Sequence, residues 1–193
     1  MTSIIKVNNI QNSSGTSALT IDSSGRITKP QLPFFHVEAF TATSSNASQT
    51  GVINFNGIVT NQGSHWNSSN NRFEAPITGL YQFSFNGFGS RTSTGGVMNS
   101  SVDNQVILQK STDSGSNYTT AAMGGYGFFN SGNGYLNLSF TIALALNSGD
   151  YIRFNANKGY VFVQDKASNY FASASGHLIC LLYTSDAADE FMG

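Results

Sequence analysis

Charged residues are scarce in this sequence. Asp, Glu, Lys and Arg make up 10% of the 193 residues and leave a net charge of −1, whereas charged residues form about a quarter of an ordinary globular domain. No basic run is present, so we predict no nucleic-acid partner, because such binding depends on Lys and Arg that neutralise phosphates. Ser, Thr, Asn and Gly replace the Glu, Lys and Arg that usually cover helices, which favours short strands joined by turns.

Cysteine and histidine are rare as well. Cys180 is the single cysteine, so no intrachain disulfide is possible and the fold depends on core packing or on association. Because Cys180 lies in the apolar stretch 178–182, we expect a buried and unreactive thiol. His36, His65 and His177 have no spacing typical of metal ligands. We place His65 in a loop or at the edge of the core.

Motifs that would indicate catalysis are also missing. The sequence has no glycine-rich phosphate loop ahead of a helix and no Gly-x-Ser-x-Gly nucleophile motif. Seven Asp and three Glu leave few acids for a glycosidase, although a catalytic carboxylate pair is a spatial feature and this alternative stays open. We therefore predict a non-enzymatic protein without a cofactor.

The N-terminal segment 1–33 differs in character from the rest of the chain. It has no basic region followed by a long apolar run, so we expect neither a secretory signal peptide nor membrane insertion. Its short apolar stretches are separated by the turn clusters Asn12–Gly15 and Asp22–Gly25, and Pro30 and Pro33 bracket a stiff connector. This apolar mass is too small to fold alone. We predict a β-leader that pairs with other chains in a stalk, and an unstructured leader is the alternative.

From residue 34 onward, apolar residues alternate in short runs that turn signals separate, and no helical periodicity is found. This pattern predicts an all-β sandwich or jelly roll. The expected strands are Phe35–Phe40, Val52–Ile58, Gly79–Phe88, Val102–Leu108, Tyr118–Ala122, Gly125–Phe129, Tyr135–Leu146, Tyr151–Phe154, Tyr160–Val163 and Ser175–Leu182.

One pattern of aromatic spacing is more informative than the rest. In single letters it reads F-x5-N-x4-W-x6-F-x5-G-x-Y-x-F-x-F. Side chains repeat every two residues along a strand, so the last three rings share one face, and rings of this size dominate the energetics of a core. The pattern consists of Phe55, Asn61, Trp66, Phe73, Gly79, Tyr81, Phe83 and Phe85.

This spacing resembles the signature of the complement C1q-like domain of the tumour necrosis factor superfamily. The resemblance extends over residues 34–183, where Leu146–Phe154 and Ser175–Ile179 are similar to later strands of the family. It departs at 91–101, a lengthened Gly- and Ser-rich loop, and no collagen tract is present. The resemblance implies a ten-stranded jelly roll that assembles as a compact homotrimer.

The resemblance also directs attention to possible ligands. Some C1q-like domains bind calcium, and Asp103, Asp113 and Asp165 are the candidate oxygen ligands here, with solvated turn residues as the alternative. Tyr118, Tyr126 and Asn130 are chemically suited to contacts with sugars and stand as candidate surface contacts. Three weak sites on one rigid head would act together by avidity.

The leader carries a second resemblance. Ile4–Gly15 and Ala18–Arg26 are similar to leaders on fibre and appendage proteins of tailed phages, especially marine ones. Residues 184–193 resemble translated sequencing-adapter read-through, with a genuine polar tail as the alternative, and we assign them no function.

We predict a phage fibre or receptor-binding head, located on the virion or outside the cell. It contacts a host surface protein or glycan, and its leader contacts other virion proteins. A purely structural capsid-decoration trimer and a cellular extracellular C1q-family protein are the alternatives.

Overall fold

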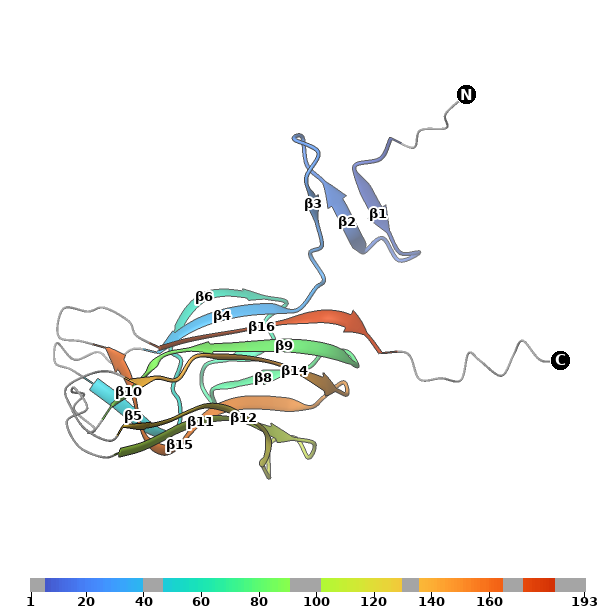
Figure 1. Ribbon diagram of the computed structural model, residues 1–193. Helices are drawn as coiled ribbons and strands as arrows, with labels where there is room; N and C mark the ends of the chain where they lie inside the picture. The colour runs from blue at the N-terminus through green and yellow to red at the C-terminus, as the bar shows by residue number, and fades with distance from the viewer. Residues whose placement is uncertain (1–5, 40–46, 91–101, 130–135, 165–171, 183–193) are drawn as a thin grey trace, which may run out of the picture.

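The computed structural model describes residues 6–39, 47–90, 102–129, 136–164 and 172–182. Every regular element within these ranges is a strand, and no helix in them is long and apolar enough to cross a membrane. The all-β class predicted from the composition is therefore confirmed. Figure 1 shows a two-layered β-sandwich with a small separate sheet at the N-terminal end.

One layer of the sandwich is an antiparallel five-stranded sheet. Its strand order is β14-β9-β16-β4-β6, so strands from both ends of the domain lie at its centre. The strands are β4 (Phe34–Ala39), β6 (Gly57–Gln62), β9 (Gly79–Asn86), β14 (Phe140–Leu146) and β16 (Ala172–Leu181).

The second layer is built around the long strand β15. Its main path runs β12-β11-β15-β10-β13, while β5 and β8 also pair with β15 and β7 pairs with β8. The strands are β5 (Ala47–Val52), β7 (Trp66–Asn67), β8 (Arg72–Glu74), β10 (Phe88–Ser90), β11 (Val102–Ser111), β12 (Thr119–Phe129), β13 (Leu136–Asn137) and β15 (Tyr151–Gln164).

Aromatic rings fill the space between the two layers. The alternating Tyr81, Phe83 and Phe85 of β9 are 0–2% exposed, as strand periodicity requires. The ring of Phe73 lies 5.6 Å from that of Tyr81 and 5.7 Å from that of Phe83, both edge-on, a geometry that aromatic pairs favour. Phe55 makes a similar edge contact with Trp66 at 5.8 Å. The six aromatic positions of the sequence pattern thus belong to one core cluster.

The leader forms a sheet of its own, with order β1-β2-β3. Its strands are β1 (Asn9–Gln11), β2 (Ser17–Ile21) and β3 (Ile27–Thr28). The same turn occurs twice: the Asn12 side-chain oxygen accepts hydrogen bonds from the backbone N–H of Ser14 and Thr16, and Asp22 does so from Ser24 and Arg26. Gly15 and Gly25 close these turns with φ of 85° and 78°, which glycine adopts without strain.

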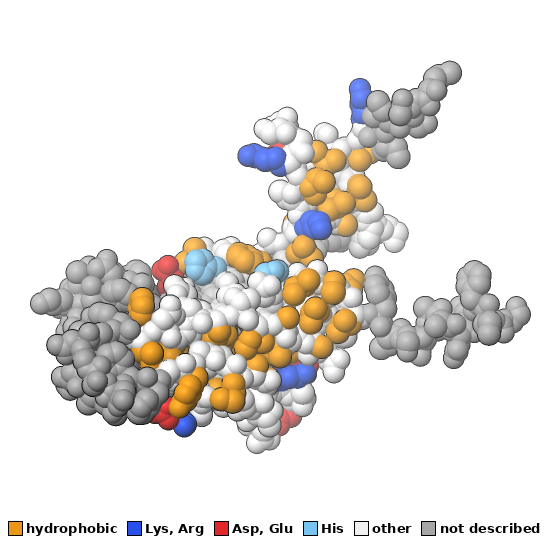
Figure 2. All heavy atoms as spheres, viewed as in Figure 1, with side chains coloured by type: hydrophobic (Ala, Val, Ile, Leu, Met, Phe, Trp, Pro, Cys, Tyr) orange, Lys and Arg blue, Asp and Glu red, His pale blue; other side chains and the backbone are white. Residues whose placement is uncertain are grey.

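Few contacts join the leader to the sandwich. The amide nitrogen of Gln62 donates to the carbonyl oxygens of Lys29 and Leu32 at 2.9 and 2.7 Å. Val7, Ile10 and Ile27 of the leader stay 40–61% exposed. The leader is therefore ordered into strands while these three side chains stay largely uncovered, and Figure 2 shows hydrophobic side chains at the surface of this small sheet.

Several expectations from the sequence were wrong. The two strands expected at 118–122 and 125–129 form one strand, β12, as do those at 151–154 and 160–163 in β15, while 135–146 divides into β13 and β14. The alternation in 52–58 predicted one strand, but β5 ends at Val52 and β6 begins at Gly57. Ile53 and Phe55 are buried because the connecting segment is anchored to Phe154 and Asn71 by hydrogen bonds of 3.1 and 2.8 Å.

Cys180 is exposed, not buried. The pairing of β16 with β9 shifts register between Leu178 and Cys180, and an extra residue in a strand reverses which face the following side chains occupy. The loop 91–101, Asn130, Asp165 and the tail 184–193 lie outside the described residues.

Candidate recognition surfaces

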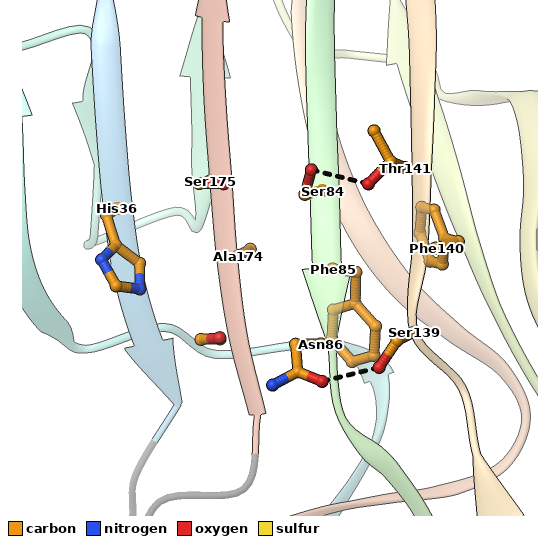
Figure 3. A pocket seen from close by; sticks show the side chains of 10 residues that line it. His36, Ser84, Phe85, Asn86, Ser139, Phe140, Thr141, Ala174 and Ser175 are labelled. Atoms are coloured by element: carbon orange, nitrogen blue, oxygen red, sulfur yellow. Dashed lines mark hydrogen bonds between the residues drawn. The ribbon is translucent and has the colours of Figure 1, made fainter.

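The outward face of the five-stranded sheet carries many short hydroxyl side chains, together with His36, Glu38 and His177. One row crosses all five strands, and in register it consists of Thr141, Ser84, Ser175, His36 and Thr60. The hydroxyl groups of Ser84 and Thr141 are hydrogen bonded at 2.9 Å. Figure 3 shows Thr141, Ser84, Ser175 and His36 on four neighbouring strands of the sheet. We name this face the small-residue face.

An open hollow of about 400 Å³ lies on the small-residue face. Its lining contains no Asp, Glu, Lys or Arg, and Ser139 donates to the amide oxygen of Asn86 at 2.6 Å at one end. Short Ser, Thr and Ala side chains leave this hollow open, so side chains of another protein surface can approach the backbone closely. The hollow is wide and open, which suits contact with a protein surface.

The outward face of the other sheet is different, because it carries tyrosines stacked on cationic side chains. The guanidinium carbon of Arg153 lies 3.6 Å from the centre of the Tyr118 ring. Nε of the same arginine donates to the side-chain oxygen of Gln109 at 2.8 Å. The guanidinium of Arg72 stacks in the same way on Tyr151, at 3.9 Å. These contacts hold long side chains in fixed positions, which lowers the entropy that a ligand contact costs.

A polar pocket of about 110 Å³ adjoins the Arg72–Tyr151 stack. It lies where the short strands β7 and β8 join β15, because Asn67 pairs with Arg72 and Glu74 pairs with Tyr151. Partial burial raises the pKa of the Tyr151 hydroxyl most. The hydrogen bond to Glu74 and the negative charge of Glu74 raise it further. The lining residues are Ser64, His65, Asn67, Arg72, Glu74 and Tyr151, and we name them the His65 pocket.

His65 is held in the pocket by its neighbours. Its ring packs edge-on against Phe73 at 6.4 Å and lies so close to Gly63 that a Cβ there would be 2.4 Å from Nε2. Gly63 has φ of 79° and Ser64 has φ of 60°, so the turn in front of His65 needs a glycine for both conformation and space. Burial lowers the pKa of His65, with the charge of Glu74 acting in the opposite direction.

The structure separates the residues that the sequence analysis selected for ligand contacts. Tyr118 lies beside the Arg72–Tyr151 stack, since its hydroxyl is near Gly115, which also borders Arg72. Tyr126 is 54% exposed and pairs with Gln105, towards the other end of β11. About eight residues of strand, roughly 25 Å, separate the two tyrosines. One small ligand therefore cannot contact both.

The candidate calcium ligands are also apart. Asp103, near the start of β11, forms an ion pair with Lys158 at 2.9 Å. Asp113 follows the end of β11, and its two oxygens accept hydrogen bonds from Ser111, from the backbone of Asn117 and from the Asn117 amide. Among the described residues, no three His, Cys, Asp or Glu side chains gather as metal ligands. Asp103 and Asp113 cannot share one ion.

The fold and its aromatic core define a class of protein, the two-sheet jelly rolls of the C1q and tumour necrosis factor type. A family model described as "C1q domain" matches residues 35–179. The chain therefore belongs to the C1q domain family. Domains of this type commonly form homotrimers and bind receptors. A search of curated proteins found no match to the chain.

Solved structures share the fold at low sequence identity. The globular domain of zebrafish complement 1qA is 17% identical, with a TM-score of 0.53 over 79% of this chain and all of that one. Murine APRIL, solved at pH 5.0, is 10% identical with a TM-score of 0.53 over 77% of this chain and all of that one. The Eiger TNF of S. frugiperda is 9% identical, with a TM-score of 0.53 over 80% of this chain and 96% of that one. The jelly-roll prediction is confirmed.

The His65 pocket was not found from the sequence. Residue type and spacing predict His65 only as a loop or core-edge residue and indicate no role for the other five lining residues. A signal was nevertheless present. Trp66 and Phe73 pair with each other and face the core, so the residues beside each of them must face outward. The signature that predicts the core also places these polar neighbours on the surface.

Proposed function

We propose that this chain is a non-enzymatic, homotrimeric recognition module of a tailed-phage virion, in a fibre or a receptor-binding head. The small-residue face packs against the other two copies. The tyrosine-bearing sheet and the loops then face outward and contact a host surface protein or glycan. The leader attaches the head to other virion proteins.

The observation that carries the trimer is the small-residue face. Thr141, Ser84 and Ser175 are half-buried or exposed on an open sheet of five strands. The aromatic core covers only the inner face of this sheet, and the short side chains of the outer row let a partner surface approach the backbone. A second copy is the favoured occupant, because homotrimers are common among C1q-type domains.

The phage assignment is supported by the leader. Its sequence is similar to phage appendage leaders, and its three strands repeat one turn at a spacing of ten residues, from Asn12 to Asp22. Repeated short strands with exposed apolar side chains are what a stalk shared by several chains requires. Two alternative roles would use the same association face. One is a capsid-decoration trimer, and the other is a cellular extracellular C1q-family protein.

Light scattering after size exclusion tests the trimer. We expect a mass three times that of the 20.6 kDa chain. Ser175→Arg should reduce it to that of one chain, because three like charges would face each other at the centre of the assembly. Ser116→Arg, at an exposed position in the β11–β12 turn, is the matched control and should leave the trimer intact. A wild-type chain that is a folded monomer would overturn the proposal.

The virion role needs a separate experiment. Mass spectrometry of purified particles, from the phage whose genome carries the gene, should detect the chain. Deletion of the gene should abolish adsorption to host cells. Particles that adsorb normally but lose their DNA on heating would support the decoration alternative, and absence of the chain from particles would exclude a virion role.

A further inference from the structure

The geometry points to the His65 pocket as a binding site for one neutral sugar unit at the end of a glycan. This inference rests on the proposed function, in which the outward sheet contacts the host, and it names the site and the ligand class. It assigns the role to Arg72, Glu74 and His65, and not to the exposed Tyr126.

The charges of the pocket favour a neutral ligand. Arg72 and Glu74 are two residues apart on β8 and therefore point to the same side. His65 is uncharged near neutral pH, because burial lowers its pKa. The positive charge of Arg72 is thus balanced by Glu74 within the same pocket. A carboxylated or phosphorylated ligand attracted to Arg72 would be repelled by Glu74.

The hydrogen-bonding groups match vicinal hydroxyls. Neutral histidine, asparagine and serine each both donate and accept, as does each hydroxyl of a sugar. Arg72 supplies fixed donors, since Nη1 already donates to the carbonyl oxygen of Ser114 at 3.4 Å and the guanidinium is stacked on Tyr151. Glu74 supplies a charged acceptor, and charge-assisted hydrogen bonds are the stronger ones. An apolar ligand would satisfy none of the remaining donors and acceptors of these groups.

The size of the pocket limits the ligand. Its volume of about 110 Å³ is below the roughly 300–1,000 Å³ of pockets that bury a drug-sized molecule. One sugar ring can insert an edge while the rest of a glycan extends along the sheet towards Tyr118. Affinity at one such site is weak, and three pockets on one trimer would raise it by multivalency.

The test uses the full-length wild-type protein and a panel of free monosaccharides. Saturation-transfer NMR should detect a neutral hexose or N-acetylhexosamine, with little signal from sialic acid or glucuronic acid. Glu74→Gln, which keeps the shape of the side chain, should weaken binding about tenfold or more, the effect of losing a charged hydrogen-bond partner. Asp103→Asn is the matched control, because it removes a carboxylate from the same sheet near the start of β11, at the other end from the pocket.

The outcomes separate this inference from the proposed function. Light scattering and thermal unfolding of each variant show whether the assembly is intact. Equal sugar binding by Glu74→Gln and the wild-type protein would overturn the assignment of the pocket while leaving the trimer in place. Selective binding of the acidic sugars would overturn the neutral-ligand argument. Adsorption to deglycosylated cells that is lost with Glu74→Gln would identify a protein ligand instead.

Discussion

The side chain of Asn61 is hydrogen bonded to both backbone polar groups of Trp66. Its amide nitrogen donates to the Trp66 carbonyl oxygen at 2.8 Å, and its oxygen accepts from the Trp66 N–H at 3.0 Å. Asn61 thereby takes the place of a neighbouring strand on the edge of β7 that does not pair with β8. It fixes the turn that presents His65 and orients Trp66 into the core, where the indole stacks on Phe35 at 4.9 Å.

Asn61→Ala should therefore destabilise the domain. The substitution leaves two partly buried backbone groups of Trp66 without partners, at a cost of about 1–3 kcal/mol. Urea unfolding followed by Trp66 fluorescence measures the change. Asn67→Ala removes an amide that accepts one exposed hydrogen bond, from Ser69, and should cost much less. Equal effects of the two substitutions would contradict this role of the Asn61 hydrogen bonds to Trp66.

Gly176→Ala should disturb the aromatic core. A Cβ at Gly176 would lie 2.4 Å from the Phe35 ring and 2.7 Å from the Phe83 ring, so both rings must shift. Overpacking of this kind costs about 1–3 kcal/mol. Thermal unfolding measures it, and Ser173→Ala, three residues earlier on the outward face of the same strand, should change stability by less than about 0.5 kcal/mol. An unchanged Gly176→Ala protein would show that the core has room for a methyl group.

The stability of the domain should depend on His65 in weakly acidic solution. The pKa of His65 is lowered from 6.5 by burial, so the unfolded chain binds a proton that the folded chain does not. The contribution of His65 to stability is therefore full above pH 6.5, and it falls as the pH drops from 6.5 towards the lowered pKa. Chemical unfolding of wild-type and His65→Asn proteins across this range should show a steeper decline for the wild type. Parallel curves would mean that the pKa of His65 is unshifted.

Asp113 should show the same sign at lower pH, because its pKa is also lowered in the folded chain. Hydrogen bonds from the Ser111 hydroxyl, the Asn117 backbone and the Asn117 side chain lower its pKa from 3.8 to about 2. Its contribution is present above 3.8 and is lost as the pH falls through about 2. Carbon-13 NMR titration of the carboxyl group measures the pKa directly. An ordinary pKa, or a large change in the carboxyl carbon-13 chemical shift when calcium is added at neutral pH, would contradict a role confined to the β11–β12 turn.

The core could be predicted from the sequence because it depends on local alternation. Phe83 and Phe85 follow a period of two, and a strand with that period must bury one face. Cys180 shows where this reasoning ends. A single extra residue in the pairing of β16 with β9 reverses the face, and nothing in the local sequence marks that residue.

The surfaces were harder to predict, since they combine residues from distant segments. Tyr118 was selected by residue type, and the structure places it beside Arg153 and close to Arg72, which is 46 positions away. Asp103 and Asp113 were considered together as calcium candidates, and the length of β11 separates them. Residue type indicates what a side chain can bind, whereas only the pairing of strands sets its neighbours.

The amino-acid sequence by itself determined the all-β class, the aromatic core and membership of the C1q family, because these follow from spacing along one chain. The tertiary structure alone decided the small-residue face and the His65 pocket. Both are made by strands that are far apart in sequence, such as β8 and β15, and their register brings Glu74 opposite Tyr151. Register is set by packing of the whole sandwich, so no local pattern could specify which polar groups would meet.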